Sequence, residues 1–292
     1  MEWLFEPFEV SFVQRALWGG VLVSLICAPV GTWVVLRGTA FLGDAMAHGM
    51  LPGVALASLL GGSLVLGAAA SAATMALGVA ALTRFPRLSG DTSIGLLFVG
   101  MLSAGVIIVS HSESFAVDLT AFLFGDVLAV RPQDLRNLAL ALAVVVAVSA
   151  LGHRAFTALA FDPRKAGTLG LRPGAAHATL LGLMTLAIVA SFHVVGTLLV
   201  LGLLIAPPAA AALWAGRIPL VMLGAAAVGT VSTVLGLVIS WHAGTAAGAT
   251  IAAVAVTAFF LAAGAAALRD LRRGPTAAAH ETTMEREVEH AS

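Results

Sequence analysis

Apolar runs long enough to cross a membrane recur along this chain of 292 residues. A helix of about 20 residues spans the roughly 30 Å hydrocarbon layer, where only helices and closed barrels satisfy every backbone hydrogen bond. The runs therefore predict an all-α integral membrane protein. We count eight or nine transmembrane helices, because the break near residues 191–193 is short; they lie near 12–36, 40–60, 63–82, 92–110, 134–152, 175–192, 194–214, 218–240 and 246–268.

The composition excludes several classes of protein. Hydrophobic residues make up 60% of the chain and charged residues 10%, which is far from a soluble enzyme. Lys and Arg together number 15, as do Asp and Glu, and no basic block suggests nucleic-acid binding. The one cysteine, Cys27, leaves no disulfide framework and no cysteine metal cluster within a single chain.

The chain also lacks the motifs that hold nucleotides. Its one lysine, Lys165, stands in Arg-Lys-Ala-Gly, whereas a P-loop needs Gly-Lys-Ser/Thr to reach the phosphates. None of its glycines are spaced as Gly-x-Gly, so the dinucleotide-binding fingerprint is absent as well. We expect no enzyme activity in this chain. If transport needs ATP, a separate subunit hydrolyses it.

The positive charges predict the orientation. The leader before residue 11 has acidic residues but no cation, so the first span is expected to be a retained helix and not a cleaved signal. With nine spans and the N-terminus outside, three arginines fall outside: Arg15, Arg131 and Arg136. The other twelve cations fall in the cytoplasm, which is the positive-inside bias, and the C-terminus is then cytoplasmic.

Three segments stand apart from the spans of the transmembrane domain, residues 1–268. The outer connection 111–134 includes a largely apolar piece, 119–130, of a length that favours a re-entrant or interfacial helix. The inner connection 153–174 predicts a short cytoplasmic helix, with Asp162 as its cap and Pro163 at its first position. The polar tail 269–292 is predicted to be disordered.

The second span holds two ionisable residues at membrane depth. Asp44 and His48 are four residues apart, so they project from one helical face about 6 Å apart along the axis. Counting inward from Arg37 places them roughly 10 Å and 16 Å deep. An ionisable group there costs about 2.5 to 3.5 kcal/mol, which favours a function. Gly49 and Gly53 add a spacing that lets another helix approach closely.

One carboxylate and one imidazole form half of a coordination shell. A second copy related by a two-fold axis would complete an Asp2His2 set, which suits zinc or manganese equally and suits copper(I) poorly. The chemistry therefore predicts a dimer. The alternative is structural: Asp44 caps a helix that begins near Ala45, and His48 hydrogen-bonds a neighbouring helix.

The outer connection offers a second candidate site. His111, Glu113 and Asp118 lie within eight residues of one another, and His193 and His242 fall near the same surface in this topology. They are candidates for a metal entry site. Loops of this kind usually carry such residues simply because they are solvated.

Three stretches of the sequence resemble the permease family of bacterial zinc and manganese ABC importers, often called the ABC-3 family. They are GDAMAHGMLPGVALA at 43–57, FDPRKAGTLGLRPG at 161–174 and VVGTLLVLGLLIAPPAAAAL at 194–213. The resemblance implies a homodimeric permease in the bacterial plasma (inner) membrane, two cytoplasmic ATPases and an extracytoplasmic metal-binding protein.

The resemblance also assigns residues. It implies that Asp44 and His48 of both copies bind the transported zinc or manganese ion at the dimer axis. It further implies that the inner connection couples the permease to the ATPases through Asp162, Pro163, Arg164, Lys165, Ala166, Gly167 and Gly170.

Three other functions compete with this one. A permease of the siderophore or cobalamin importers would share the coupling loop but needs no paired Asp and His. A proton-coupled secondary metal carrier should show inverted repeats and several buried acids, of which this sequence has no clear sign. A membrane scaffold without transport leaves the intramembrane acid unexplained.

Overall fold

A computed structural model describes residues 6–83, 89–110, 125, 129–161 and 172–273. Within these residues all regular secondary structure is helical, which confirms the all-α prediction. Eight stretches are long and apolar enough to cross a membrane, if α3 and α4 count as one. The helices are η1 (Glu6–Glu9), α2 (Ser11–Leu36), α3 (Ala40–His48), α4 (Leu51–Leu59), α5 (Leu64–Leu82), α6 (Gly90–Ser110), α8 (Pro132–Phe161), α10 (Pro173–Ala212), α11 (Ile218–Ala243) and α12 (Ala247–Arg273).

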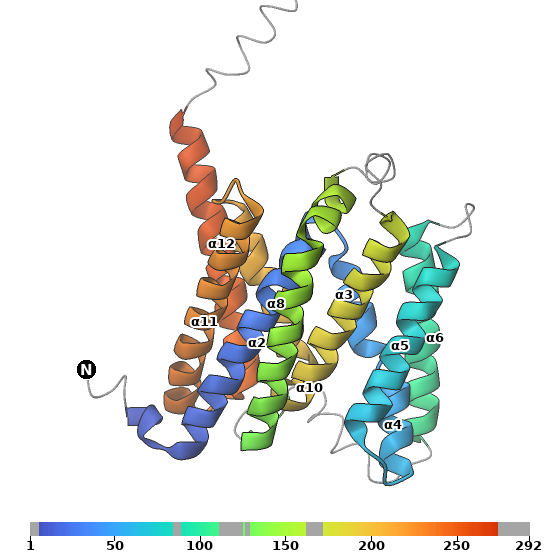
Figure 1. Ribbon diagram of the computed structural model, residues 1–292. Coiled ribbons are helices and arrows are strands. Elements are labelled where there is room, and N and C mark those ends of the chain that lie inside the picture. Colours follow the sequence, from blue (N-terminus) through green and yellow to red (C-terminus); the bar gives the residue numbers. More distant parts are fainter. Residues whose placement is uncertain (1–5, 84–88, 111–124, 126–128, 162–171, 274–292) are drawn as a thin grey trace, which may run out of the picture.

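The helices form one bundle with α2 and α10 at its centre (Figure 1). In Figure 1, α11 and α12 lie on one side of this pair and α5 and α6 on the other. Small residues let α2 approach α10: a Cβ added to Gly31 would lie 2.0 Å from the carbonyl oxygen of Leu204. The two helices are therefore in backbone contact, and only glycine fits at that point.

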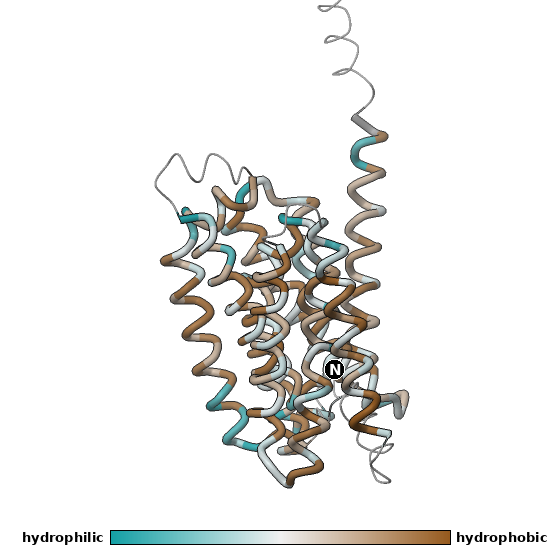
Figure 2. Tube along the Cα trace, turned by 90° about the vertical axis from the view of Figure 1, so that its right-hand side faces the viewer, coloured by the Kyte–Doolittle hydropathy of each residue, from teal (hydrophilic) through white to brown (hydrophobic). Residues whose placement is uncertain are grey.

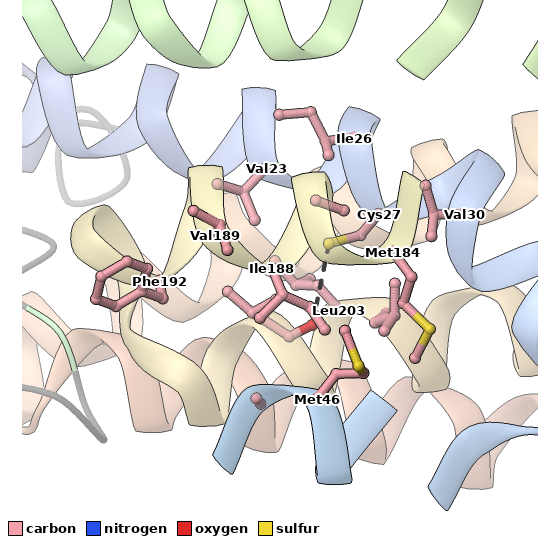
Figure 3. Close-up of a cluster of buried hydrophobic side chains, with 14 of the residues drawn as sticks. Val23, Ile26, Cys27, Val30, Met46, Met184, Ile188, Val189, Phe192 and Leu203 are labelled. Carbon is pink, nitrogen blue, oxygen red and sulfur yellow. Dashed lines mark hydrogen bonds between the residues drawn. The ribbon is translucent and has the colours of Figure 1, made fainter. Parts of the chain in front are cut away.

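Helix α10 crosses the bundle twice. A straight helix of its 40 residues would be about 60 Å long, twice the hydrocarbon thickness. Gly196 interrupts it with φ 74° and ψ 165°. Met184 and Leu204 lie on opposite sides of this break, yet both reach within 3.3 Å of a Cβ built on Gly43. The chain therefore folds back at Gly196. Figure 3 shows the two arms of α10 turning back on each other near the labelled Phe192.

This fold-back agrees with the predicted pair of spans at 175–192 and 194–214, with the break a few residues later than the sequence suggested. Counting α10 twice, the described residues make nine passes. The core between them is apolar: Ile26, Met46 and Ile188 are among its fully buried side chains (Figure 3). Polar residues gather at the ends of the helices (Figure 2).

Two helices extend beyond the predicted spans. Helix α8 continues to Phe161, so residues 153–161 of the predicted inner connection are helical. Helix α12 continues to Arg273, which includes the first residues of the predicted tail. The rest of the connection, 162–171, and of the tail, 274–292, lies outside the described residues.

Candidate metal centre

Asp44 and His48 lie on α3, whose opposite face is buried. The carboxylate Oδ1 of Asp44 is 3.4 Å from Nε2 of His48, and their side chains are 39% and 27% exposed. Gly43 packs behind them against both arms of α10. The i, i+4 prediction is confirmed: the two side chains share one face and point to one place.

The helix breaks directly after His48. Helix α3 ends there and α4 begins at Leu51, with Pro52 in its first turn. Because proline has no N–H, one carbonyl in the preceding turn loses its helical partner. The neighbouring Gly49 carbonyl accepts a hydrogen bond of 2.7 Å from the Ser71 hydroxyl on α5. This contact ties the kink below the site to the next helix.

The predicted close helix contact is also confirmed. A Cβ on Gly53 would lie 2.0 Å from the carbonyl oxygen of Gly67, and one on Gly67 would lie 2.2 Å from that of Gly53. A Cβ on Gly49 would lie 3.0 Å from Met75. Helices α4 and α5 therefore meet backbone to backbone along this face.

Two aromatic rings stand beside the site. The edge of Phe98 on α6 meets the imidazole of His48, with ring centroids 5.8 Å apart. Phe41, one turn before Asp44, packs edge-on against the same Phe98 ring at 5.9 Å. The aromatic contact restricts the orientation of the His48 ring. Nothing in the sequence pattern singled out Phe98, or Ser71 below it.

The donor set is small. Within the described residues, no group of three or more His, Cys, Asp or Glu side chains comes together. Asp44 thus offers a carboxylate and His48 an imidazole nitrogen as metal ligands, and both side chains are partly exposed. Such a pair fits a divalent transition metal and requires further ligands from elsewhere.

No other histidine in the described part of the chain joins this pair. His193 and His242 are exposed. The His153 and Trp33 rings meet at a tilt, with centroids 5.7 Å apart. Arg37 Nη1 lies 3.2 Å from Nδ1 of His177, and because a guanidinium only donates, that imidazole nitrogen accepts. Burial lowers the pKa of Arg37 from its usual value, although a guanidinium remains charged at neutral pH.

The other candidates belong to the two long connections of the chain. The entry-site residues His111, Glu113 and Asp118 lie outside the described residues. The same holds for the coupling segment from Asp162 to Gly170. These assignments therefore stay predictions.

Comparisons with known proteins agree with this architecture. A manganese transport system membrane protein, MntC of Listeria monocytogenes, is 35% identical over 254 residues, covering 87% of this chain and 90% of that protein. A probable iron transport system membrane protein of Haemophilus influenzae is 35% identical over 261 residues, covering 89% and 96%.

A solved structure, PsaBC from Streptococcus pneumoniae in complex with Fab, matches with a TM-score of 0.79 and 30% identity, covering 89% of this chain and 94% of that one. The model of the ABC 3 transport family matches residues 9–266. The resemblance found in the sequence is thus confirmed, and so is a role as a transport component whose ATPase is a separate subunit. This chain belongs to the ABC 3 transport family, as a multi-span permease subunit of an ABC transporter.

Proposed function

We propose that this chain is the permease of an importer that moves a divalent transition metal into the cytoplasm, with manganese as the first candidate and zinc as the alternative. The observation that supports this proposal is the partly exposed pair of Asp44 and His48, 3.4 Å apart on one face of α3. Both metals accept these ligands, and the manganese transport relatives favour manganese.

The metal is the cargo, and two copies of the chain bind it. Each copy contributes one carboxylate and one imidazole from an open face, which together make a four-ligand set around a two-fold axis. The paired helix is held from behind by α10 and α5, so the ligands sit on a rigid wall. A site open on the dimer axis can receive the ion from one side and release it to the other.

The charge distribution supports an orientation with the C-terminus in the cytoplasm. Arg37 ends α2 and Arg217 precedes α11, at the end of the bundle where α12 finishes (Figure 1), here called the Arg37 end. Of the described cations, three lie at the opposite end: Arg15, Arg131 and Arg136. At the Arg37 end lie Arg37, Arg154, Arg172, Arg217, Arg269, Arg272 and Arg273. This bias favours the cytoplasm for the Arg37 end.

The partners follow from the same proposal. Two ATP-binding cassette subunits dock at the Arg37 end on the connection between α8 and α10, where the predicted residues Asp162 to Gly170 lie. An extracytoplasmic binding protein delivers the ion at the opposite end. Nucleotide binding shifts the helices between outward-open and inward-open arrangements.

The test is cellular metal content in a metal-starved host that expresses this chain with its cognate partners. We compare wild type with Asp44→Asn and His48→Ala at matched membrane abundance. Asp270→Asn is the matched control, because Asp270 is exposed beside Arg269 near the end of α12. Loss of manganese or zinc in both site variants, with the control unchanged, supports the proposal and identifies the metal.

Two other outcomes point elsewhere. Undiminished accumulation in both site variants moves the metal site away from α3, and the outer histidines become the first candidates. Uptake of a metal chelate but not of the free ion would favour the siderophore or cobalamin type of importer. Membership of an ABC family argues against a proton-coupled carrier and against a scaffold.

A further inference from the structure

A groove on the outside of the bundle is unrelated to the metal site. It lies between α2, α8 and α11 and has a volume of about 640 Å³. Its walls are mostly aliphatic, and along α8 they run from Leu142 to His153. That distance is about 16 Å, close to the depth of one leaflet of the hydrocarbon layer. The metal-site helix α3 packs mainly against α10 and α6, and none of the residues that line the groove lies on it.

One polar group in this groove lacks a partner. Ser149 lines the groove and is 6% exposed, and its Oγ has no hydrogen-bond partner among the described residues. Hydroxyls in membrane helices normally donate to the carbonyl four residues earlier. Thr157 on the same helix does so to His153, and Thr32 on α2 does so to Ala28. The unused Ser149 donor therefore remains available to an acceptor that enters the groove.

A second polar side chain stands one turn further along α8. The His153 imidazole lines the groove and is held from the buried side by the ring of Trp33. Trp33 also packs against Phe156, with centroids 5.6 Å apart, so this end of the groove is rigid. Most of the groove is thus apolar, and its polar side chains lie near its Arg37 end.

Positive charge flanks that polar end. Arg154 directly follows His153, and Arg217 stands two residues before Pro219, another residue of the groove wall. Both arginines are exposed, and neither forms an ion pair within the described part of the chain. The order of these features along the groove matches a phospholipid. The apolar length fits an acyl chain, the hydrogen-bond donor fits an ester carbonyl, and the two arginines fit a phosphate.

We propose that this groove binds one anionic phospholipid. Its acyl chain lies between α8 and α11, its ester carbonyl accepts from Ser149, and its phosphate faces Arg154 and Arg217. The bound lipid fills the space between three helices. The site is independent of the proposed metal transport.

The experiment uses the full chain with its ATPase partners in phosphatidylcholine nanodiscs. A photoactivatable phosphatidylglycerol with a diazirine in its acyl chain is the probe, and labelled peptides are identified by mass spectrometry. We expect label in 142–153 and 219–226. Unlabelled phosphatidylglycerol should compete for it far better than phosphatidylcholine.

Variants test each part of the site. Ala150→Phe fills the groove from an exposed position and should remove the label. Ser149→Ala should reduce it, whereas Thr185→Ala should not. Thr185 is the control because it lines a second apolar groove, between α5 and α10, but donates to the Leu181 carbonyl of its own helix.

The charges are tested in the same way. Arg154→Gln and Arg217→Gln should each weaken competition by phosphatidylglycerol roughly fivefold. Arg131→Gln and Arg136→Gln, at the opposite end of α8, should not. Equal competition by the two lipids, or label that persists in Ala150→Phe, overturns the proposal. A crosslink through α8 between two copies of the chain overturns it too and assigns the groove to an interface. Asp44→Asn should leave the label unchanged, which separates this result from any failure of the metal site.

Discussion

Two helical stretches of this protein are interrupted, and the interruptions differ in what they do to the chain. Between α3 and α4 the helix breaks at Gly49 and Met50 but keeps right-handed backbone angles, so the chain continues in one direction. In α10 the break at Gly196 takes a positive φ, and the chain turns back. The first break positions ligands, whereas the second builds the wall behind them.

The two breaks are also held in place by different kinds of contact. At the α3–α4 break a side chain takes part: the Ser71 hydroxyl donates a hydrogen bond to the Gly49 carbonyl. At the α10 break two backbones meet: Gly125, itself at φ 66°, approaches so closely that a Cβ there would lie 2.3 Å from the Gly196 nitrogen. A break held by one hydroxyl can be adjusted by one substitution. A break held by two glycines tolerates none.

The largest effect is therefore expected from Gly125→Ala. A residue with a Cβ loses about 1 to 2 kcal/mol of stability in the left-handed conformation of Gly125. The clash of the new Cβ with the Val195–Gly196 backbone costs about 1 to 3 kcal/mol more. We expect a clear drop in the thermal unfolding midpoint in detergent. Gly38→Ala is the control, because Gly38 has φ 64° but open space around it. Equal midpoints for the two variants would show that Gly125 is not held against α10.

A smaller effect is expected from Ser71→Ala, which removes the donor to the Gly49 carbonyl. A buried acceptor left without its partner costs about 1 to 3 kcal/mol. Because the kink lies directly below His48, metal uptake at matched abundance should fall as well. Thr74→Ala, on the exposed side of α5, removes only a bond to the Ala70 carbonyl of its own helix. If both variants behave alike, Ser71 has no special role at the break.

These two breaks also mark how far the sequence could predict the fold. The pairing of Asp44 and His48 was predictable, because a spacing of four residues fixes a shared helical face whatever surrounds it. The position of the α10 break was not, because Gly196 stands in an apolar run that continues on both sides. Nor was the end of α8 at Phe161, since a helix need not stop where the hydrocarbon layer does.

The surroundings of the site escaped prediction for a related reason. Phe98 is about 50 residues from His48 along the chain, and Ser71 is 22 residues from Gly49. Their contacts depend on how α5 and α6 pack against α3, which no local pattern encodes. The sequence can therefore reveal the donors of a site without the residues that orient them.

The smallest effect is expected from Phe98→Leu, and it separates orientation from stability. Leucine retains apolar volume but loses the ring edge that meets the His48 imidazole. Aromatic contacts of this kind are worth about 0.5 to 1.5 kcal/mol beyond buried area. If that energy holds the imidazole ready for metal, the concentration for half-maximal uptake should rise roughly two- to tenfold. The unfolding midpoint should change little.

Phe260→Leu supplies the matched comparison, because Phe260 on α12 makes a similar edge contact with Phe259 and is far more exposed. It should change neither metal uptake nor the unfolding midpoint by much. An unchanged uptake curve in Phe98→Leu would mean that α3 alone orients His48. The break after His48 would then suffice to set the site, and α6 would serve only as packing.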